Sequence, residues 1–179
     1  MYLIVKRQNG GTVAIIAQKY TERRLQNTCF RGPERRLAGN FLRWRNLVQV
    51  LNDGIVLGQL MEAVENAILE NERQNSLTVD YPEPVGWSST DRLERYRPED
   101  LEPFKLNKRS TALRLKADRT HLAAPSTSFL TIIFEASLHD KPPAVVIRSV
   151  YPGEDIGELD GDLTAREKCV FFDWSHPGE

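Results

Sequence analysis

The chain has few of the residues on which covalent or metal-dependent chemistry usually depends. Its 179 residues include two cysteines and three histidines, and Cys29 and Cys169 stand far apart with no CxxC spacing. We therefore exclude a paired-cysteine metal or redox site and interpret both thiols as structural, in a reducing compartment. The sequence also lacks a Gly-rich phosphate loop, an HExxH motif and a GxSxG elbow. These absences remove the usual signatures of P-loop nucleotide hydrolases, zinc peptidases and serine hydrolases.

Long apolar runs are also missing. Residues 1–5 are apolar, but Lys6 and Arg7 end that run well short of a membrane span or a signal-peptide core. Apolar residues make up 40% of the chain and charged residues 27%, which is typical of a folded domain. The sequence therefore predicts a soluble cytoplasmic protein that does not contact a membrane.

Charge is nearly balanced overall, at a formal net of -1, but it is unevenly distributed. Residues 21–45 contain seven arginines and two glutamates, whereas residues 154–162 contain five acids and no base. Clustered arginines can follow a phosphate backbone, cover a solvated helix face or contact an acidic partner protein. The acidic run lacks the regular spacing and closing glutamate of a calcium loop, so we interpret it as a solvated loop. The sequence predicts neither a metal site nor a cofactor.

The first half of the chain predicts a β-hairpin followed by a helical hairpin. Residues 2–5 and 12–17 are rich in strand formers around an Asn-Gly-Gly turn, and residues 1–33 form this hairpin and an Arg-rich segment. From residue 34 apolar side chains recur at helical spacing, which predicts a first helix up to the break at residues 52–54. Its stripe consists of Leu37, Phe41, Trp44, Leu47, Val48 and Leu51. A second helix is predicted over residues 55–73, with Leu57, Leu60, Met61, Val64 and Ile68 on its inner side.

The second half predicts a loop and then a sheet. Prolines at 82, 84, 98 and 103 make residues 75–107 a long connection, with a short helix ending near Tyr96. Strands are predicted over residues 111–118, 129–138, 144–151 and 169–174. Meander pairing would place them in one four-stranded antiparallel sheet covered by the helices. The expected fold is therefore a single α+β domain over residues 34–179.

The candidate catalytic residues lie at one connection between two predicted strands. Arg119, Thr120 and His121 follow the strand at 111–118, and Ser126, Thr127 and Ser128 lead into the next. Metal-free RNA cleavage needs an acid or base near neutral pKa, a cation on the phosphate and hydroxyls to orient it. A structural interpretation is also open, in which His121 caps a turn and Arg119 forms a surface salt bridge.

Other residues extend this candidate site. Tyr151 ends a core strand and its hydroxyl could approach His121 if the strands are adjacent. Trp87 follows a glycine in the proline-marked region and could stack on a base or fill the core. Nearby cations could widen an electropositive surface for the substrate: Lys105, Lys108, Arg109, Arg114 and Lys116.

With helices before an antiparallel sheet that carries Arg119, Thr120, His121, Ser128 and Tyr151, the chain resembles the BECR group of bacterial ribonuclease toxins. This group includes barnase, EndoU, colicin and RelE types. The resemblance implies a metal-independent RNA endonuclease of toxin or effector type, restrained by a cognate antitoxin or immunity protein.

Two other functions are compatible with the sequence. One is a non-catalytic protein-binding factor, phage-encoded or immunity-type, that uses the helical hairpin and the acidic loop and could dimerise through that hairpin. The other is a nucleotide-using transferase in which Trp87 stacks on the ligand.

Overall fold

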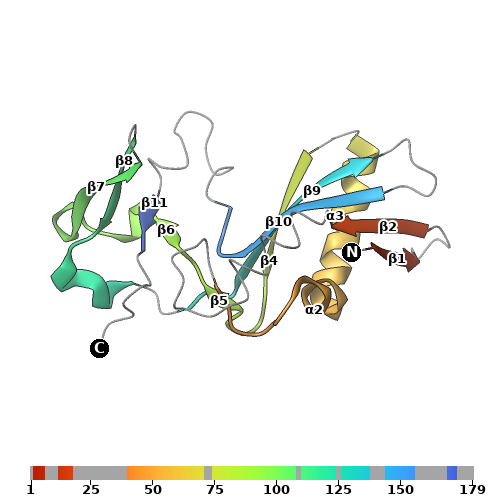
Figure 1. Ribbon diagram of the computed structural model, residues 1–179, viewed down its shortest axis with the longest axis horizontal. Helices are drawn as coiled ribbons and strands as arrows, with labels where there is room; N and C mark the ends of the chain where they lie inside the picture. Colours follow the sequence, from red (N-terminus) through yellow and green to blue (C-terminus); the bar gives the residue numbers. More distant parts are fainter. Residues whose placement is uncertain are drawn as a thin grey trace.

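The computed structural model describes residues 2–6, 12–17, 40–70, 74–107, 110–123, 126–137, 144–155 and 169–172. Figure 1 shows a larger sheet with its helices at one end of the molecule and a smaller sheet at the other. The fold is α+β, as the sequence predicts. The expected purely antiparallel arrangement is wrong, because both sheets also contain a parallel pair of strands.

The larger sheet has five strands in the order β1-β2-β10-β9-β4. Their bounds are β1 Tyr2–Lys6, β2 Thr12–Ala17, β10 Ala144–Pro152, β9 Phe129–Ser137 and β4 Gln74–Asp80. The two predicted antiparallel pairs, β1 with β2 and β9 with β10, are confirmed. The N-terminal hairpin joins the sheet through parallel pairing of β2 with β10.

The helices are α2 (Leu47–Asn52) and α3 (Gly54–Glu70). The predicted break at residues 52–54 and the second helix are confirmed, although residues 71–73 lie outside the described residues. The expectation of a first helix from residue 34 is wrong for residues 40–46. Asn40–Phe41 form the short strand β3, and α2 begins only after Asn46. The Asn46 side chain accepts a hydrogen bond from Gln49 N at 2.9 Å, which caps the helix there.

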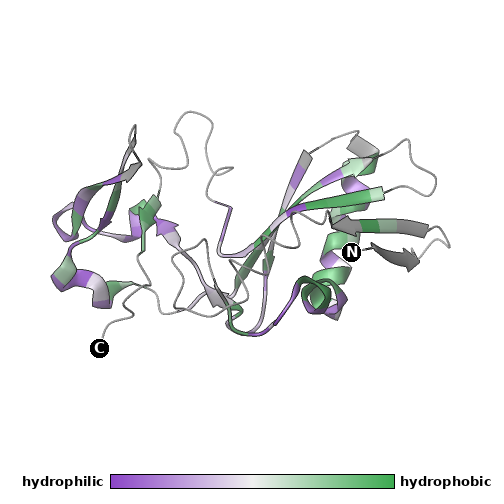
Figure 2. Cartoon of the chain, in the orientation of Figure 1, coloured by the Kyte–Doolittle hydropathy of each residue, from purple (hydrophilic) through white to green (hydrophobic). Residues whose placement is uncertain are grey.

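The core lies between α3 and the five-stranded sheet. Along β9 the alternate residues Leu130, Ile132 and Phe134 are fully buried, and they pack in one cluster with Leu60 and Val64 of α3. Figure 2 shows apolar residues concentrated on β9, β10 and α3. Complete burial of each such side chain contributes about 1.5–3 kcal/mol. This cluster holds the helix and the sheet together.

The smaller sheet has four strands in the order β6-β11-β8-β7. Their bounds are β6 Thr90–Arg92, β11 Cys169–Phe171, β8 Ser110–Leu115 and β7 Leu101–Asn107. The predicted strands at 111–118 and 169–174 therefore exist in shortened form, but they pair here, parallel to each other, and not with β9 and β10. Strand-forming patterns are local, whereas the choice of partner depends on residues far away in the sequence.

The prediction of a long loop over residues 75–107 is wrong. This region supplies β4, β6 and β7, together with β5 (Gly86–Trp87), which pairs with β3. The 3-10 turn η1 (Leu93–Arg95) replaces the short helix that was expected there. A second 3-10 turn, η2 (Pro98–Asp100), begins at a proline. Pro103 occupies β7, which lies at the edge of its sheet, where a missing N–H is tolerated.

None of the helices in the described ranges is long and apolar enough to cross a membrane.

Candidate functional site

The candidate catalytic turn is the 3-10 segment η3 (Ala117–Leu122), and its side chains are exposed. Arg119 Nε forms an ion pair with Asp100 Oδ1 at 3.1 Å. The Thr120 hydroxyl donates to the carbonyl oxygen of Ala117 at 3.3 Å. His121 stands beside them on the surface of the turn. The guanidinium expected to hold a phosphate is therefore already paired with a carboxylate.

Of the other predicted cations in the described residues, two are already engaged by acceptors. Arg114 Nε pairs with Glu102 Oε1 at 2.8 Å, and Lys116 Nζ donates to the carbonyl oxygen of Glu99. Lys105 is exposed on β7. Two further predicted cations lie outside the described residues: Lys108 and Arg109.

The remaining predicted residues lie on the strands of the larger sheet or near β5. The Ser128 hydroxyl donates to Asp80 Oδ1 at 3.2 Å. Tyr151 is half-buried on β10 opposite Thr131. Trp87 is half-buried on β5 and lines neither of the two pockets described below. Of these two pockets, Ser128 lines the first and His121 lines neither.

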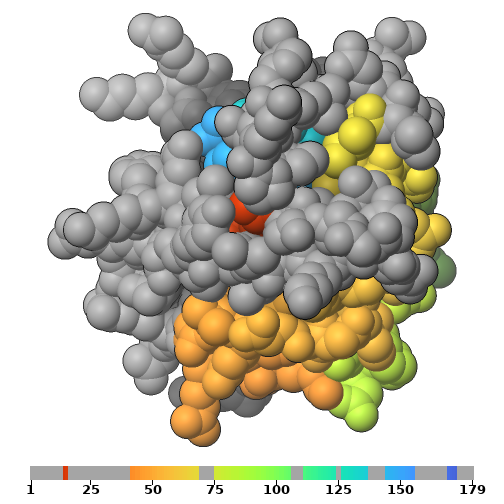
Figure 3. Space-filling model, turned by 90° about the vertical axis from the view of Figure 1, so that its right-hand side faces the viewer, coloured from red at the N-terminus to blue at the C-terminus, as the bar shows by residue number. Residues whose placement is uncertain are grey.

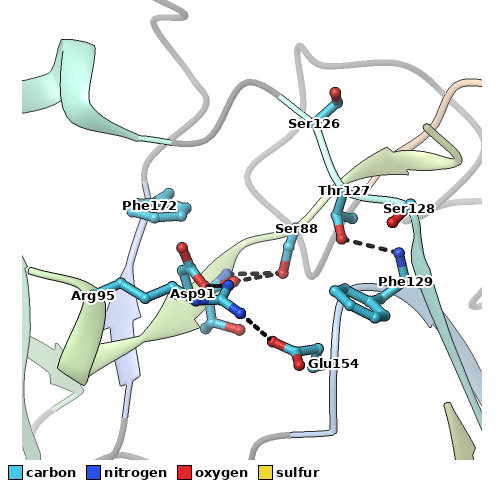
Figure 4. Close-up of a pocket in the computed structure, with 11 residues that line it drawn as sticks. Ser88, Asp91, Arg95, Ser126, Thr127, Ser128, Phe129, Glu154 and Phe172 are labelled. Carbon is cyan, nitrogen blue, oxygen red and sulfur yellow. Dashed lines mark hydrogen bonds and ion pairs between the residues drawn. The ribbon is translucent and has the colours of Figure 1, made fainter. Parts of the chain in front are cut away.

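A pocket of about 180 Å³ lies where the two sheets meet, and we call it the inter-sheet pocket. It is lined by five hydroxyl residues, three charged residues, two aromatic rings and a glycine: Ser88, Thr90, Ser126, Thr127, Ser128, Asp91, Arg95, Glu154, Phe129, Phe172 and Gly153. Figure 4 shows Phe172 and Phe129 on opposite sides of Ser88, with the Ser126 hydroxyl turned away toward the rim. The hydroxyl triplet predicted at 126–128 therefore belongs to this pocket.

An ion-pair network forms the wall of the pocket. Glu154 Oε1 accepts from Arg92 Nη2 at 2.7 Å, and Glu154 Oε2 accepts from Arg92 Nε and Arg95 Nη2, each at 3.1 Å. Asp91 accepts from Arg95 Nη1 and from the Tyr96 hydroxyl, the latter at 2.8 Å. The hydrogen bonds that Arg92 donates to Glu154 raise the pKa of Arg92. This network joins β6 and η1 to the chain that follows β10.

This network was not predicted from the sequence. The i,i+4 spacing of Asp91 and Arg95 was a usable local signal, although the expected helix is a strand and a 3-10 turn. Glu154 belonged to the acidic run interpreted as a solvated loop, yet its side chain is 14% exposed. Asp155, the next acid, accepts a hydrogen bond from the Ser76 hydroxyl. Residues 156–162 of the run lie outside the described residues.

A second, more open pocket of about 520 Å³ lies beside η2 and η3. Arg119 lines it together with Arg97, Asp100 and Leu122, and it shares Arg95 with the inter-sheet pocket. Three arginines and two acids line it, and Arg119 and Asp100 are paired with each other.

Three large apolar side chains on or near α2 and the first turn of α3 are exposed to solvent. Leu42, Val48 and Ile55 are 49%, 42% and 40% exposed. With the exposed Arg45 they form a surface that we call the α2–α3 corner. Figure 3 shows this part of the chain, in orange, on the outer face of the molecule.

Asp53 holds the α2–α3 corner in place. Its Oδ1 accepts from the backbone N–H groups of Ile55 and Val56 at 3.1 and 3.4 Å, which caps α3, and its Oδ2 accepts from the Tyr81 hydroxyl at 2.9 Å. Burial, followed by the hydrogen bond to Asp53, raises the pKa of Tyr81. The Arg43 guanidinium lies 4.8 Å from the centre of the Tyr81 ring.

The described residues contain no cluster of three or more histidine, cysteine or acidic side chains that could hold a metal ion. Cys169 is a buried free thiol, and burial raises its pKa to about 11. The inert, structural role expected for this cysteine agrees with that environment. Cys29 lies outside the described residues.

No protein-family model matches the chain, and neither curated proteins nor solved structures match it.

Proposed function

We propose that this protein is a non-catalytic binding protein that docks an acidic partner protein on the α2–α3 corner. The observation that carries this proposal is the exposure of Leu42, Val48 and Ile55 within fourteen residues of chain. The described residues contain four large apolar side chains that are exposed, and the remaining one is Leu122, on η3. Single exposed apolar residues need no explanation, but a group of them on one surface is typical of a contact site.

The charge near the corner favours an acidic partner. Arg45 is exposed and forms no ion pair with any residue that the structure describes. It ends the segment 21–45 with its seven arginines and two glutamates. An arginine beside aliphatic side chains is typical of the centre of protein interfaces. RNA is the other polyanion that arginines attract, but a phosphate backbone gains little from three aliphatic side chains.

The corner is also held rigid before a partner arrives. Asp53 fixes the start of α3, and Leu47, Val50 and Leu51 bury the opposite face of α2. A surface that is already ordered loses less conformational entropy on binding.

Site-specific crosslinking tests the proposal. A photo-crosslinking amino acid at Val48 should capture an acidic protein in cells that express the chain naturally, whereas the same group at Leu122 should not. The captured protein, once purified, should bind the wild-type chain with an affinity that falls as salt rises. Val48→Ser and Arg45→Glu should each weaken binding at least about tenfold, and the matched control Leu122→Ser should leave it unchanged. Crosslinks to RNA at Val48, or equal affinity in all variants, would refute the proposal.

Metal-independent RNA cleavage is a second candidate. It is favoured by the exposure of Arg119, Thr120 and His121 on one turn, where a polymer substrate can reach all three. Its test is cleavage of RNA in EDTA by the purified chain, abolished by His121→Ala and retained in Leu122→Ser. Intact RNA with the wild-type protein would eliminate this candidate and leave the binding function.

A further inference from the structure

We propose that the inter-sheet pocket binds a neutral polyhydroxylated molecule of the size of a single sugar ring. This site is separate from the α2–α3 corner and does not depend on the function proposed there.

The hydroxyl groups of the pocket can both donate and accept hydrogen bonds. The Thr90 hydroxyl forms no hydrogen bond within the described part of the chain, where only the Thr90 backbone bonds to Ser88 Oγ. Thr127 Oγ1 accepts from Phe129 N at 3.1 Å, which leaves its proton free to be donated. A ligand whose own groups are hydroxyls matches such a lining, because each contact can form in either direction.

The charges of the wall argue against a charged ligand. Two guanidinium groups, of Arg92 and Arg95, contact two carboxylates, of Asp91 and Glu154. Arg92 also pairs with the exposed Glu94 at 3.5 Å. Every charged group of this network is therefore already paired, and an anion or a cation would have to displace an existing partner. Arg95 uses its two terminal nitrogens in these ion pairs. Its remaining N–H groups can still donate to a neutral oxygen.

The aromatic rings and the volume define the size and faces of the ligand. Phe172 and Phe129 lie on opposite sides of the pocket and offer apolar surface to the C–H groups of a ring (Figure 4). The volume of about 180 Å³ equals the volume that about six molecules occupy in liquid water. That is below the range of drug-sized sites, so the part of a ligand that the pocket holds is about the size of a single ring.

A ligand in this position contacts both sheets. Thr127 and Glu154 flank β9 and β10, whereas Thr90 and Phe172 belong to or follow strands of the smaller sheet. Binding therefore adds contacts across the junction in addition to the Arg92–Glu154 pair, and it should stabilise the arrangement of the two sheets.

Saturation-transfer NMR on the full chain provides the test, with D-glucose, D-galactose, D-ribose and myo-inositol as neutral probes. Glucose 6-phosphate, glucuronate and glucosamine serve as charged probes of similar size. Saturation passes only to a molecule that contacts the protein. The signal therefore reports binding, and not the general stabilisation that sugars exert by exclusion from the protein surface. We expect transfer to at least one neutral probe and weaker or no transfer to its charged counterpart.

Thr90→Val and Thr127→Val each remove one pocket hydroxyl while keeping the shape of the side chain. Each should weaken binding of the neutral probe about five- to tenfold. Thr111→Val, at an exposed position on β8 outside the pocket, is the matched control and should bind as the wild type does. Circular dichroism establishes that each variant is folded. Absence of transfer to every neutral probe, tighter binding of a charged probe, or unchanged affinity in both pocket variants would overturn the proposal.

Discussion

Arg92 and Glu154 form a two-point ion pair across the junction of the two sheets. Arg92 Nη2 lies 2.7 Å from Glu154 Oε1, and Arg92 Nε lies 3.1 Å from Glu154 Oε2. Arg92 ends β6 in the four-stranded sheet, and Glu154 follows β10 of the five-stranded sheet. The fork of the guanidinium matches the two carboxylate oxygens, so the pair fixes orientation as well as distance.

Glu154→Ala should lower the free energy of unfolding by about 1–3 kcal/mol, because Arg92 and Arg95 lose their partner in a half-buried site. The matched control is Glu135→Ala, which breaks the more exposed pair with Arg148 and should cost under about 1 kcal/mol. Urea unfolding followed by tryptophan fluorescence measures both. If both variants lost the same free energy of unfolding, Glu154 would stabilise the junction no more than an exposed ion pair does.

Gly153→Ala should be destabilising for two reasons. Gly153 has φ +119°, where a side chain is strained, and a Cβ built there meets Ser88 Oγ at 2.5 Å. We expect a loss of about 1–3 kcal/mol. Gly58→Ala, on α3 with open space around it, should instead stabilise by about 0.5–1 kcal/mol. Gly153→Ala should cost less in a Ser88→Gly background than in the wild type, because that background lacks the contact and keeps the backbone strain.

The buried thiol of Cys169 should react slowly. Burial raises its pKa from 9.0 to about 11, so at pH 8 its thiolate fraction is about 100-fold below that of an unperturbed thiol. In a Cys29→Ala background, labelling with a disulfide reagent should be slow in the native state and fast in denaturant. Fast labelling of the folded chain would contradict the burial.

The same shift predicts a loss of stability in alkali. The unfolded chain releases the Cys169 proton near pH 9.0, whereas the folded chain retains it until about pH 11. Between these values the folded state binds more protons, so the free energy of unfolding falls as pH rises. The decrease should be smaller in Cys169→Ala, as measured by urea unfolding at pH 8, 9 and 10. Parallel pH profiles for the two proteins would show that this thiol makes no contribution.

Asp53→Ala should cost about 1–3 kcal/mol. The change removes the cap of α3 and leaves the buried Tyr81 without the acceptor of its hydroxyl proton. In Asp53→Ala combined with Tyr81→Phe the cost should be less than the sum of the two single costs, because both changes remove the same hydrogen bond. Glu62→Ala, at an exposed site on α3, is the control and should be neutral. Thermal unfolding followed by circular dichroism measures all four variants.

Much of the local structure could be predicted because it depends on neighbouring residues. The break at residues 52–54, the helix that follows it and the two antiparallel hairpins all agree with their sequence patterns. The start of α2 was placed wrongly, because Phe41 and Trp44 follow helical spacing but reach the core from β3 and from the segment between β3 and α2. Asn46, a good N-cap residue, marks the start of the helix better than the spacing of the apolar residues does.

The candidate site was harder to predict, because it depends on contacts between distant residues. The hydroxyls at 126–128 line a pocket, but the side chains that join them are Arg95, Asp91 and Glu154, and not His121 or Arg119. Arg119 is exposed, as expected for a residue that holds a phosphate, but it is paired with Asp100. Asp100 belongs to the region that the sequence predicted to be a loop.

The sequence by itself determined the buried faces of β9 and α3. The alternation of Leu130, Ile132 and Phe134 requires one buried face whatever covers it, and α3 has an apolar stripe of helical period. Only the tertiary structure decided that β8 pairs with β11 and that Glu154 contacts Arg92. Any strand offers the same backbone hydrogen bonds, so its partner is chosen by the packing of residues far apart in the chain.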